Sequence, residues 1–241
     1  MNPVFLTAEW RDLVMLNYAV DPAILVPHVP NGTELDSWDG TTFVSLVAFS
    51  FLNTRVKGVS IPFHRNFEEI NLRFYVRAKG PEGWRRGVVF VKEVVPRLAI
   101  ASVARWLYNE NYVACPTRSH RNDSGGVRSL EYGWQHCGDW LSIGVKSAGE
   151  PALPDEGSEE EFITEHYWGY SAQRDGGTVE YRVEHPQWQV WEASSHIAHG
   201  DFQGFYGCEL AGPLAGPPTS AFLADGSPVM VRQGGHLRQA V

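Results

Sequence analysis

The chain has 241 residues, 43% of them hydrophobic and 20% charged, which fits an ordinary globular protein with one large domain or two small ones. Its formal net charge of −8 argues against nucleic acid as a partner, because phosphate contacts need a basic patch. An anionic membrane surface is disfavoured for the same reason. The longest apolar stretch, Val44 to Leu52, is too short to span a bilayer, and the N-terminus lacks a signal-peptide pattern. We therefore expect a cytoplasmic protein.

The first part of the chain is predicted to be mostly strand. Residues 4–6 favour a short edge strand, and residues 11–20 are rich in β-forming side chains. Asp21 is a good N-cap and is followed by proline, so we expect a short helix over residues 22–28. Residues 41–56 then read as one long strand.

Two further strands and a helix follow. Residues 67–77 alternate apolar and polar side chains, the pattern of a strand with two different faces. Residues 83–96 form a strand that is apolar on both faces and ends at proline. Residues 97–108 carry apolar side chains at helical spacing.

The second half of the chain is predicted to contain hairpins. Residues 127–147 indicate a hairpin that turns near Gly138 and Asp139. Residues 147–161 are acidic and rich in proline and glycine, which is typical of a surface loop, and they end in a capping box for a short helix. The segment "EHYWGYSAQRDGGTVEYRVE" reads as two strands around a glycine turn, and residues 221–233 as a last hairpin.

Many strands at short spacing, with few short helices, favour a mainly β fold. The expected architecture is a single antiparallel β-barrel or a strongly bent sandwich, because closure removes the strand edges that would otherwise be exposed. We expect one such domain over residues 1–241, with residues 147–161 as a loop within it. Exposed aromatic residues in the last hairpin would suit a homodimer.

Metal and cofactor motifs are missing from the sequence. Cys115, Cys137 and Cys208 are far apart and odd in number, so they indicate free thiols in a reducing compartment rather than a disulfide framework or zinc site. His196 and His199 have a spacing that suits a metal on a helix, but their surroundings resemble a strand end. Walker, G-x-G-x-x-G and H-E-x-x-H motifs are absent. We therefore predict neither a metal nor a cofactor.

Three groups of polar residues are candidates for a site. The first is Glu69, Asn71 and Arg73, which share one face of their strand. In an ordinary sheet this face meets solvent. In a barrel it lines a wet cavity, where a carboxylate, an amide and a guanidinium can orient a polar ligand.

The second group is Lys92 and Glu93, within a strand that is apolar on both faces. Burial there would lower the pKa of the lysine and raise that of the glutamate, as in prepared nucleophiles and bases. Alternatively, Lys92 extends its amine to the rim and Glu93 pairs with an arginine.

The third group is His166, Trp168 and Tyr170, which share a face if their strand begins at His166. Such side chains are a common pocket lining, but an aromatic stripe is more often part of a core.

Several ordered segments resemble the YqjF-like family of uncharacterised bacterial proteins. They are "AEWRDLVMLNYAVDPAILVPHVP", "FEEINLRFYVR", "GVVFVKEVVP", "LYNENY", "EHYWGY", "EYRVEHPQW" and "ADGSPVMV". The family lies in the acetoacetate-decarboxylase-like superfamily, so the resemblance implies a closed or nearly closed β-barrel with a central cavity.

The resemblance also carries over to single residues. Arg11 falls where the decarboxylases carry an active-site arginine, and Glu93 resembles the glutamate that precedes their catalytic lysine pair. The lysine pair itself is absent, since the chain reads "VVPRLAIAS" after Glu93, and no acid stands near Arg55 where their cavity glutamate would fall. The resemblance thus implies a cationic anchor and disfavours imine chemistry.

Two functions are compatible with these residues. One is an enzyme acting on an organic acid or carbonyl compound, with Glu93, Glu69 or His166 in acid–base roles. Its ligand would be a small anionic molecule held by Arg11, Asn71, Arg73, Lys92, Trp168 and Tyr170. The other is a barrel that binds a ligand or a partner protein without chemistry. In both, we expect Arg11, Glu93 and the polar face of residues 67–77 to converge on one cavity.

Overall fold

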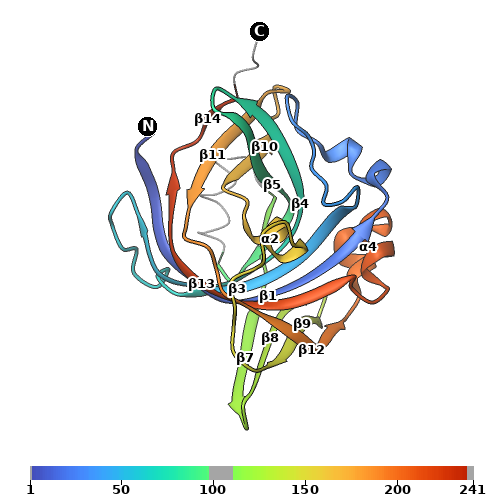
Figure 1. The fold of residues 1–241 in the computed structure, drawn as a ribbon. Helices are drawn as coiled ribbons and strands as arrows, with labels where there is room; N and C mark the ends of the chain where they lie inside the picture. The colour runs from blue at the N-terminus through green and yellow to red at the C-terminus, as the bar shows by residue number, and fades with distance from the viewer. Residues whose placement is uncertain (1, 98–110, 238–241) are drawn as a thin grey trace.

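A computed structural model describes residues 2–97 and 111–237 of the chain, and it is dominated by long, strongly curved strands (Figure 1). The strands are β1 (Val4–Val20), β2 (Glu34–Leu35), β3 (Thr42–Val56), β4 (Phe67–Gly80), β5 (Gly83–Val95), β6 (Tyr112–Ala114), β7 (Thr117–Ser124), β8 (Val127–His136), β9 (Asp139–Ala148), β10 (Trp168–Ala172), β11 (Thr178–Glu184), β12 (Val190–His199), β13 (Ser220–Arg232) and β14 (Gly235–His236). The helices are η1 (Pro22–Ile24), η2 (Val26–His28), α2 (Glu159–Thr164), α3 (Phe202–Tyr206) and α4 (Cys208–Leu214). The predicted mainly β fold is confirmed.

The bent sheet curls until the last strand along it pairs with the first. Its strands are hydrogen-bonded in the order β11, β10, β5, β4, β3, β1, β13, and β13 then pairs with β11 through Val183 opposite Val231 and Glu184 opposite Met230. Neighbours along this path are antiparallel, except that β10 runs parallel to β5. Figure 1 shows these strands curving around α2. The inner surface of the curl therefore faces an enclosed space.

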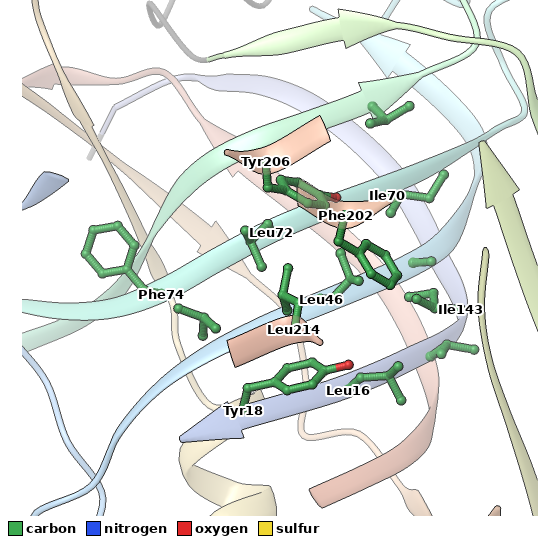
Figure 2. Close-up of a cluster of buried hydrophobic side chains, with 14 of the residues drawn as sticks. Leu16, Tyr18, Leu46, Ile70, Leu72, Phe74, Ile143, Phe202, Tyr206 and Leu214 are labelled. Carbon is green, nitrogen blue, oxygen red and sulfur yellow. The ribbon is translucent and has the colours of Figure 1, made fainter. Parts of the chain in front are cut away.

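A second layer covers part of the outer surface of the curl. Strands β12, β9, β8 and β7 form an antiparallel sheet that continues from β13. Together with α3 and α4, this sheet packs its apolar side chains against the outer side chains of β1, β3 and β4 (Figure 2). The labelled residues of this cluster are Leu16, Tyr18, Leu46, Ile70, Leu72, Phe74, Ile143, Phe202, Tyr206 and Leu214. Because this contact is apolar, the polar side chains of β4 are left on the inner surface.

The side chains of β4 alternate between the outer and the inner surface of the curl. Ile70, Leu72 and Phe74 are fully buried in the outer cluster, as the sequence predicts. Glu69, Asn71 and Arg73 point the other way, because successive side chains of a strand alternate between faces. This predicted division of residues 67–77 is confirmed.

Helix α2 fills one end of the enclosed space. The Ser158 hydroxyl accepts a hydrogen bond from the Glu161 backbone N–H at 3.1 Å, as the predicted capping box requires, while the Glu161 carboxylate accepts from Gly157 N–H instead of Ser158. Phe162 and Ile163 are buried among the inner side chains of the sheet. The helix therefore belongs to the interior, although the chain leading to it is largely exposed.

Several local predictions are wrong in detail. Residues 4–6 are not an edge strand, because β1 runs unbroken from Val4 to Val20 between β3 and β13. Residues 22–28 form two 3-10 turns rather than one helix, since Pro27 has no N–H to continue it, although the Asp21 carboxylate caps the first by accepting from Ala23 N–H at 2.8 Å. By contrast, the hairpin predicted near Gly138 and Asp139 is present as β8 and β9, and Cys137, at a φ of 51°, and Gly138 form its turn.

The last predicted hairpin is also wrong, because residues 220–232 form the single strand β13. Gly226 adopts a φ of 74°, and a Cβ atom there would lie 2.1 Å from the Trp10 carbonyl oxygen. The glycine thus permits a close approach to β1 rather than a chain reversal. Phe222 in this strand is buried, so the exposed aromatic surface that suggested a homodimer is not formed there.

Some predictions concern residues outside those described. The helix predicted over residues 97–108 falls almost entirely on residues 98–110, which lie outside the described part of the chain. Within residues 2–97 and 111–237, no helix has the length and apolar character needed to cross a membrane.

Candidate functional site

A cavity of about 230 Å³ lies inside the curl. Its wall comes mainly from β1, β3, β4, β5 and β11, together with the segments around residues 61–64, 164–168 and 185–188. The wall has two different parts. Polar side chains form a strip whose members are Glu69, Asn71, Arg73, Glu93, Thr164 and His166. Aromatic side chains form much of the remainder and include Trp10, Phe49, Phe51, Phe67, Phe90 and Trp188.

Arg73 is the cation of the polar strip. It is only 8% exposed, and its Nη2 atom donates to the Ile163 carbonyl oxygen at 3.2 Å. Its Nε atom is buried without a hydrogen-bond partner. Among the described residues, no carboxylate oxygen lies within 4.0 Å of the guanidinium nitrogens, and Nη1 is neither hydrogen-bonded nor buried. A nearly buried guanidinium in this state favours an anion as its ligand, since buried charges are normally paired.

Two carboxylates lie farther along the same strip. The Glu69 carboxylate accepts hydrogen bonds from Asn71 Nδ2 at 3.1 Å and from the Tyr112 hydroxyl at 3.4 Å. Glu93, on β5, is directly opposite Asn71 in the β4–β5 register and is 1% exposed. Since a twisted strand rises about 3.3 Å per residue, Glu69 and Arg73 are about 13 Å apart along β4. The strip therefore has a guanidinium at one end and carboxyl groups toward the other.

His166 lies beside the cationic end in an almost closed setting. Its ring packs against Tyr75 at 4.6 Å and Phe162 at 5.1 Å between centroids, and its side chain is 2% exposed. Its Nε2 atom is 3.7 Å from an Asp36 carboxylate oxygen, too far for a hydrogen bond, so the attraction is electrostatic. Burial lowers the pKa of His166 to about 4, although Asp36 opposes the shift. The imidazole is therefore neutral at pH 7.

Asp36 keeps its charge in this setting because Arg86 holds it. Arg86 Nε donates to Asp36 Oδ2 at 2.7 Å, and Ser37 N–H donates to Oδ1 at 3.0 Å. Burial raises the pKa of Asp36, but the contacts with His166 and Arg86 outweigh it and lower the pKa to about 2. The Arg86 guanidinium also stacks on Phe162 at 4.6 Å. Asp36 and Arg86 thus form an ionised pair directly behind His166.

The aromatic part of the wall is a set of rings in mutual contact. Phe51 and Phe67 stack with centroids 4.7 Å apart and an interplanar angle of 11°. Trp10 contacts both Phe49 at 5.2 Å and Trp188 at 6.2 Å. Trp188 also donates from Nε1 to the Ser227 hydroxyl at 2.9 Å, which fixes its indole. Such contacts hold the rings in defined positions.

Arg11 does not reach the cavity, contrary to the prediction. Its Nε and Nη2 atoms contact the Glu9 carboxylate at 3.2 and 3.0 Å, and Nη1 donates to the Gly226 carbonyl oxygen at 3.1 Å. The cause is a bulge: Asp12 has a φ of 57°, and the β1–β3 register shifts between Arg11 and Val14. Trp10 and Leu13 line the cavity, and Arg11 is turned away from it.

Lys92 is also outside the cavity, because it alternates with Glu93 on β5. Its amine donates to the Phe205 carbonyl oxygen and lies over the Phe205 ring at 4.3 Å, on the outer side of the sheet. Burial lowers its pKa, while the nearby Cys115 raises it. The chain has four lysines, all within the described residues, and none of them lines the cavity.

The third predicted group is divided by the structure. The strand begins at Trp168 rather than His166, so the assumption that placed His166, Trp168 and Tyr170 on one face is wrong. Tyr170 lies in the outer apolar cluster and donates to the Arg85 carbonyl oxygen at 3.2 Å. Trp168 contributes to the cavity wall, but its indole stacks under the Arg85 guanidinium at 4.2 Å.

Comparison with known proteins places the chain in a family. Residues 7–228 match the model of DUF2071, described as "Uncharacterized conserved protein". The chain belongs to this family. The DUF2071 chain is also 27% identical over 205 residues to the "Uncharacterized protein YqjF" of Bacillus subtilis (strain 168), which covers 83% of this chain and 81% of that protein. The resemblance to the YqjF-like family is therefore confirmed.

Solved structures show the same fold at low sequence identity. The DUF2071 chain is similar to acetoacetate decarboxylase from Legionella pneumophila, with a TM-score of 0.67, 11% identity and coverage of 97% of this chain and 87% of that one. It is similar to the enduracididine biosynthesis enzyme MppR complexed with pyruvate, with a TM-score of 0.69, 13% identity and coverage of 99% and 92%. An acetoacetate decarboxylase-like enzyme from Sphingomonas wittichii RW1 gives a TM-score of 0.63 at 13% identity, with coverage of 99% and 95%.

Several residues in the DUF2071 cavity wall or directly behind it were not found from the sequence. Asp36 and Arg86 belong to segments without a polar pattern, and they meet only because β2 pairs with β4 beside β5. His185 and Trp188 line the cavity from a stretch with no regular structure, which gives no periodic signal. The sequence indicated these residues through the high density of aromatic side chains over residues 165–191.

The structure offers no metal centre in its described part. No group of three or more His, Cys, Asp or Glu side chains is gathered there as metal ligands would be. His196 and His199 are both exposed on β12, where a spacing of three places them on opposite faces.

Proposed function

We propose that this protein binds a small organic carboxylate in its interior cavity, with Arg73 as the anchor. The observation that carries the proposal is the guanidinium itself. It is nearly buried, it faces no carboxylate among the described residues within 4.0 Å, and one of its nitrogens remains accessible. A ligand carboxylate would accept charge-assisted hydrogen bonds there. Arg73 thereby takes the anchoring role first expected of Arg11.

The charge pattern of the strip indicates how such a ligand is oriented. The Arg73 guanidinium attracts the ligand carboxylate to its own end of the strip, and the Glu69 carboxyl group lies about 13 Å away along β4. The middle of the ligand then lies against Asn71 and Glu93, which are paired across β4 and β5. Polar groups in the middle of the ligand can donate hydrogen bonds to the Glu93 carboxylate.

The same strip supplies groups for acid–base chemistry on the bound acid. Glu93, directly opposite Asn71, borders the cavity beside the middle of such a ligand, and Glu69 and the neutral imidazole of His166 border it toward the two ends of the strip. An imine intermediate is not part of this proposal, because no lysine lines the cavity.

A second candidate is binding without chemistry, and one observation favours it. The His166 side chain is 2% exposed, so its nitrogens have almost no contact with the cavity space. An acid or base must reach the proton that it transfers. Glu93 is enclosed to the same degree, at 1% exposure, and this favours a carrier or sensor of a small acid.

The structural neighbours support a ligand of this kind. MppR is described in complex with pyruvate, a small carboxylate, on the same fold. The likeness is one of fold at 13% identity, so the argument for the present chain depends on its own Arg73.

The test is a binding measurement with a panel of small acids, including pyruvate, on purified protein by isothermal titration calorimetry. The variant Arg73→Met should lose binding by at least 100-fold, as expected when a charge-assisted pair of roughly 3 kcal/mol is removed. Arg11→Met is the matched control, because it removes a cation outside the cavity. Equal loss in both variants, or none in either, would contradict the proposal.

A further inference from the structure

The aromatic part of the cavity wall narrows the class of ligand. From the geometry we infer that the ligand is a carboxylic acid carrying an aromatic ring or an apolar group of similar size, rather than an acid of two to four carbons. This inference rests on the proposed function, because it assumes that the carboxylate is held at Arg73. It adds what the other end of the cavity accepts.

The register of β3 and β4 places the aromatic rings beyond the polar strip. Along β4 the inward positions run from Arg73 through Asn71 and Glu69 to Phe67, which is directly opposite Phe51. The wall therefore changes from guanidinium to carboxyl to aromatic along one strand. Phe90 is directly opposite Arg73 on β5 and also lines the cavity, so an aromatic ring lies close to the guanidinium as well.

The rings are fixed before any ligand arrives. Phe51 and Phe67 are stacked at 4.7 Å, and Trp10 lies against Phe51 at 5.7 Å and Trp188 at 6.2 Å. Trp188 is in turn stacked on His185 at 4.3 Å with an interplanar angle of 19°. A rigid set of ring faces and edges suits a flat apolar group, because it need not reorganise to bind one.

The size of the cavity also favours a ligand larger than an acid of two to four carbons. A volume of about 230 Å³ corresponds to the space of seven or eight water molecules, at about 30 Å³ each. A three-carbon acid at Arg73 would leave most of that space, and the rings around it, in contact with water. Each buried methylene group improves affinity about four-fold, so a ring that displaces this water should improve it by well over ten-fold.

A matched series of ligands tests the inference first on the unaltered protein. Propanoate, 3-phenylpropanoate and 3-phenylpropanamide are titrated by calorimetry at fixed ionic strength. We expect 3-phenylpropanoate to bind at least thirty-fold more tightly than propanoate, and at least ten-fold more tightly than the neutral amide. Phe90→Leu should reduce the advantage of the phenyl group by at least five-fold, because Phe90 is directly opposite Arg73, whereas the exposed Trp84→Leu should not change it.

The outcomes separate the two proposals. If propanoate binds as tightly as 3-phenylpropanoate and binding still depends on Arg73, the inference is wrong and the proposed function stands. If neither acid nor pyruvate binds, the proposed function fails and the inference fails with it. If the amide binds as tightly as the acid, the cavity takes an apolar ligand without a carboxylate, which also overturns the inference.

Discussion

Replacing His166 by glutamine should make the protein less sensitive to mild acid. The imidazole is enclosed by Tyr75 and Phe162, and the charged groups that face it are Asp36, Arg86 and Arg73. Glutamine keeps a polar side chain of similar length but does not titrate. The difference between the two proteins therefore isolates the proton that His166 takes up.

The expected magnitude follows from the pKa of His166 in the two states. The pKa is 6.5 in a solvated histidine and about 4 in the folded protein. The stabilisation that follows from this difference is therefore fully present above pH 6.5. That contribution is lost as the pH falls from 6.5 to 4, because the unfolded chain binds the proton first. Between pH 7 and pH 5 the loss amounts to roughly 2 kcal/mol. The pKa of Asp36, about 2, lies below this window.

The assay is urea unfolding of both proteins, followed by tryptophan fluorescence at pH 7 and pH 5. The free energy of unfolding of the wild type should fall by roughly 2 kcal/mol more than that of His166→Gln. Other titrating groups contribute equally to both proteins, and His199→Gln, at an exposed position, should behave as the wild type. Parallel changes in the wild type and His166→Gln would refute the enclosed, neutral imidazole.

Three further predictions concern the fold and the chemistry. Gly226→Ala should lower the free energy of unfolding by about 2 kcal/mol or more, because the added Cβ would lie 2.1 Å from the Trp10 carbonyl oxygen. Gly149 has a φ of 84° and open space around it, so Gly149→Ala should show only the smaller loss that comes from the backbone conformation. Equal losses of the two variants in urea unfolding would contradict this. Ser158→Ala should lower the free energy of unfolding by about 1 kcal/mol, because the N-cap of α2 is lost. The measurement is again urea unfolding, and an unchanged free energy would mean that packing alone stabilises the helix. Incubation with acetoacetate followed by borohydride should leave the protein mass unchanged, whereas an adduct that is abolished by Lys92→Ala would establish imine chemistry.

The polar strip could be predicted because a strand makes a strong periodic signal. The alternation of residues 67–77 placed Glu69, Asn71 and Arg73 on one face, and only the expected barrel, rather than the alternation, turned that face toward a cavity instead of solvent. The same reasoning separated Lys92 from Glu93 on β5. Regular alternation therefore identified the middle of the candidate site from sequence alone.

Irregular backbone explains the residues that could not be predicted. Arg11 precedes a bulge at Asp12, and a single residue in a left-handed conformation reverses every later orientation on β1. The pair Asp36 and Arg86 is 50 residues apart in sequence, and only the sheet register brings it behind His166. One sequence, read without relatives, carries no signal for either effect.

The chemistry of the cavity depends on the same alternation. On β5 the inward positions after Phe90 are Glu93 and Val95, since Val95 packs in the inner cluster while Val94 packs in the outer one. A lysine two residues after Glu93 would have faced the same interior, and valine stands there instead. Lys92, the lysine closest in sequence, is directed to the opposite side of the sheet by the rule that turns Glu93 inward. All four lysines lie in the described part of the chain, and none of their amines therefore faces this cavity.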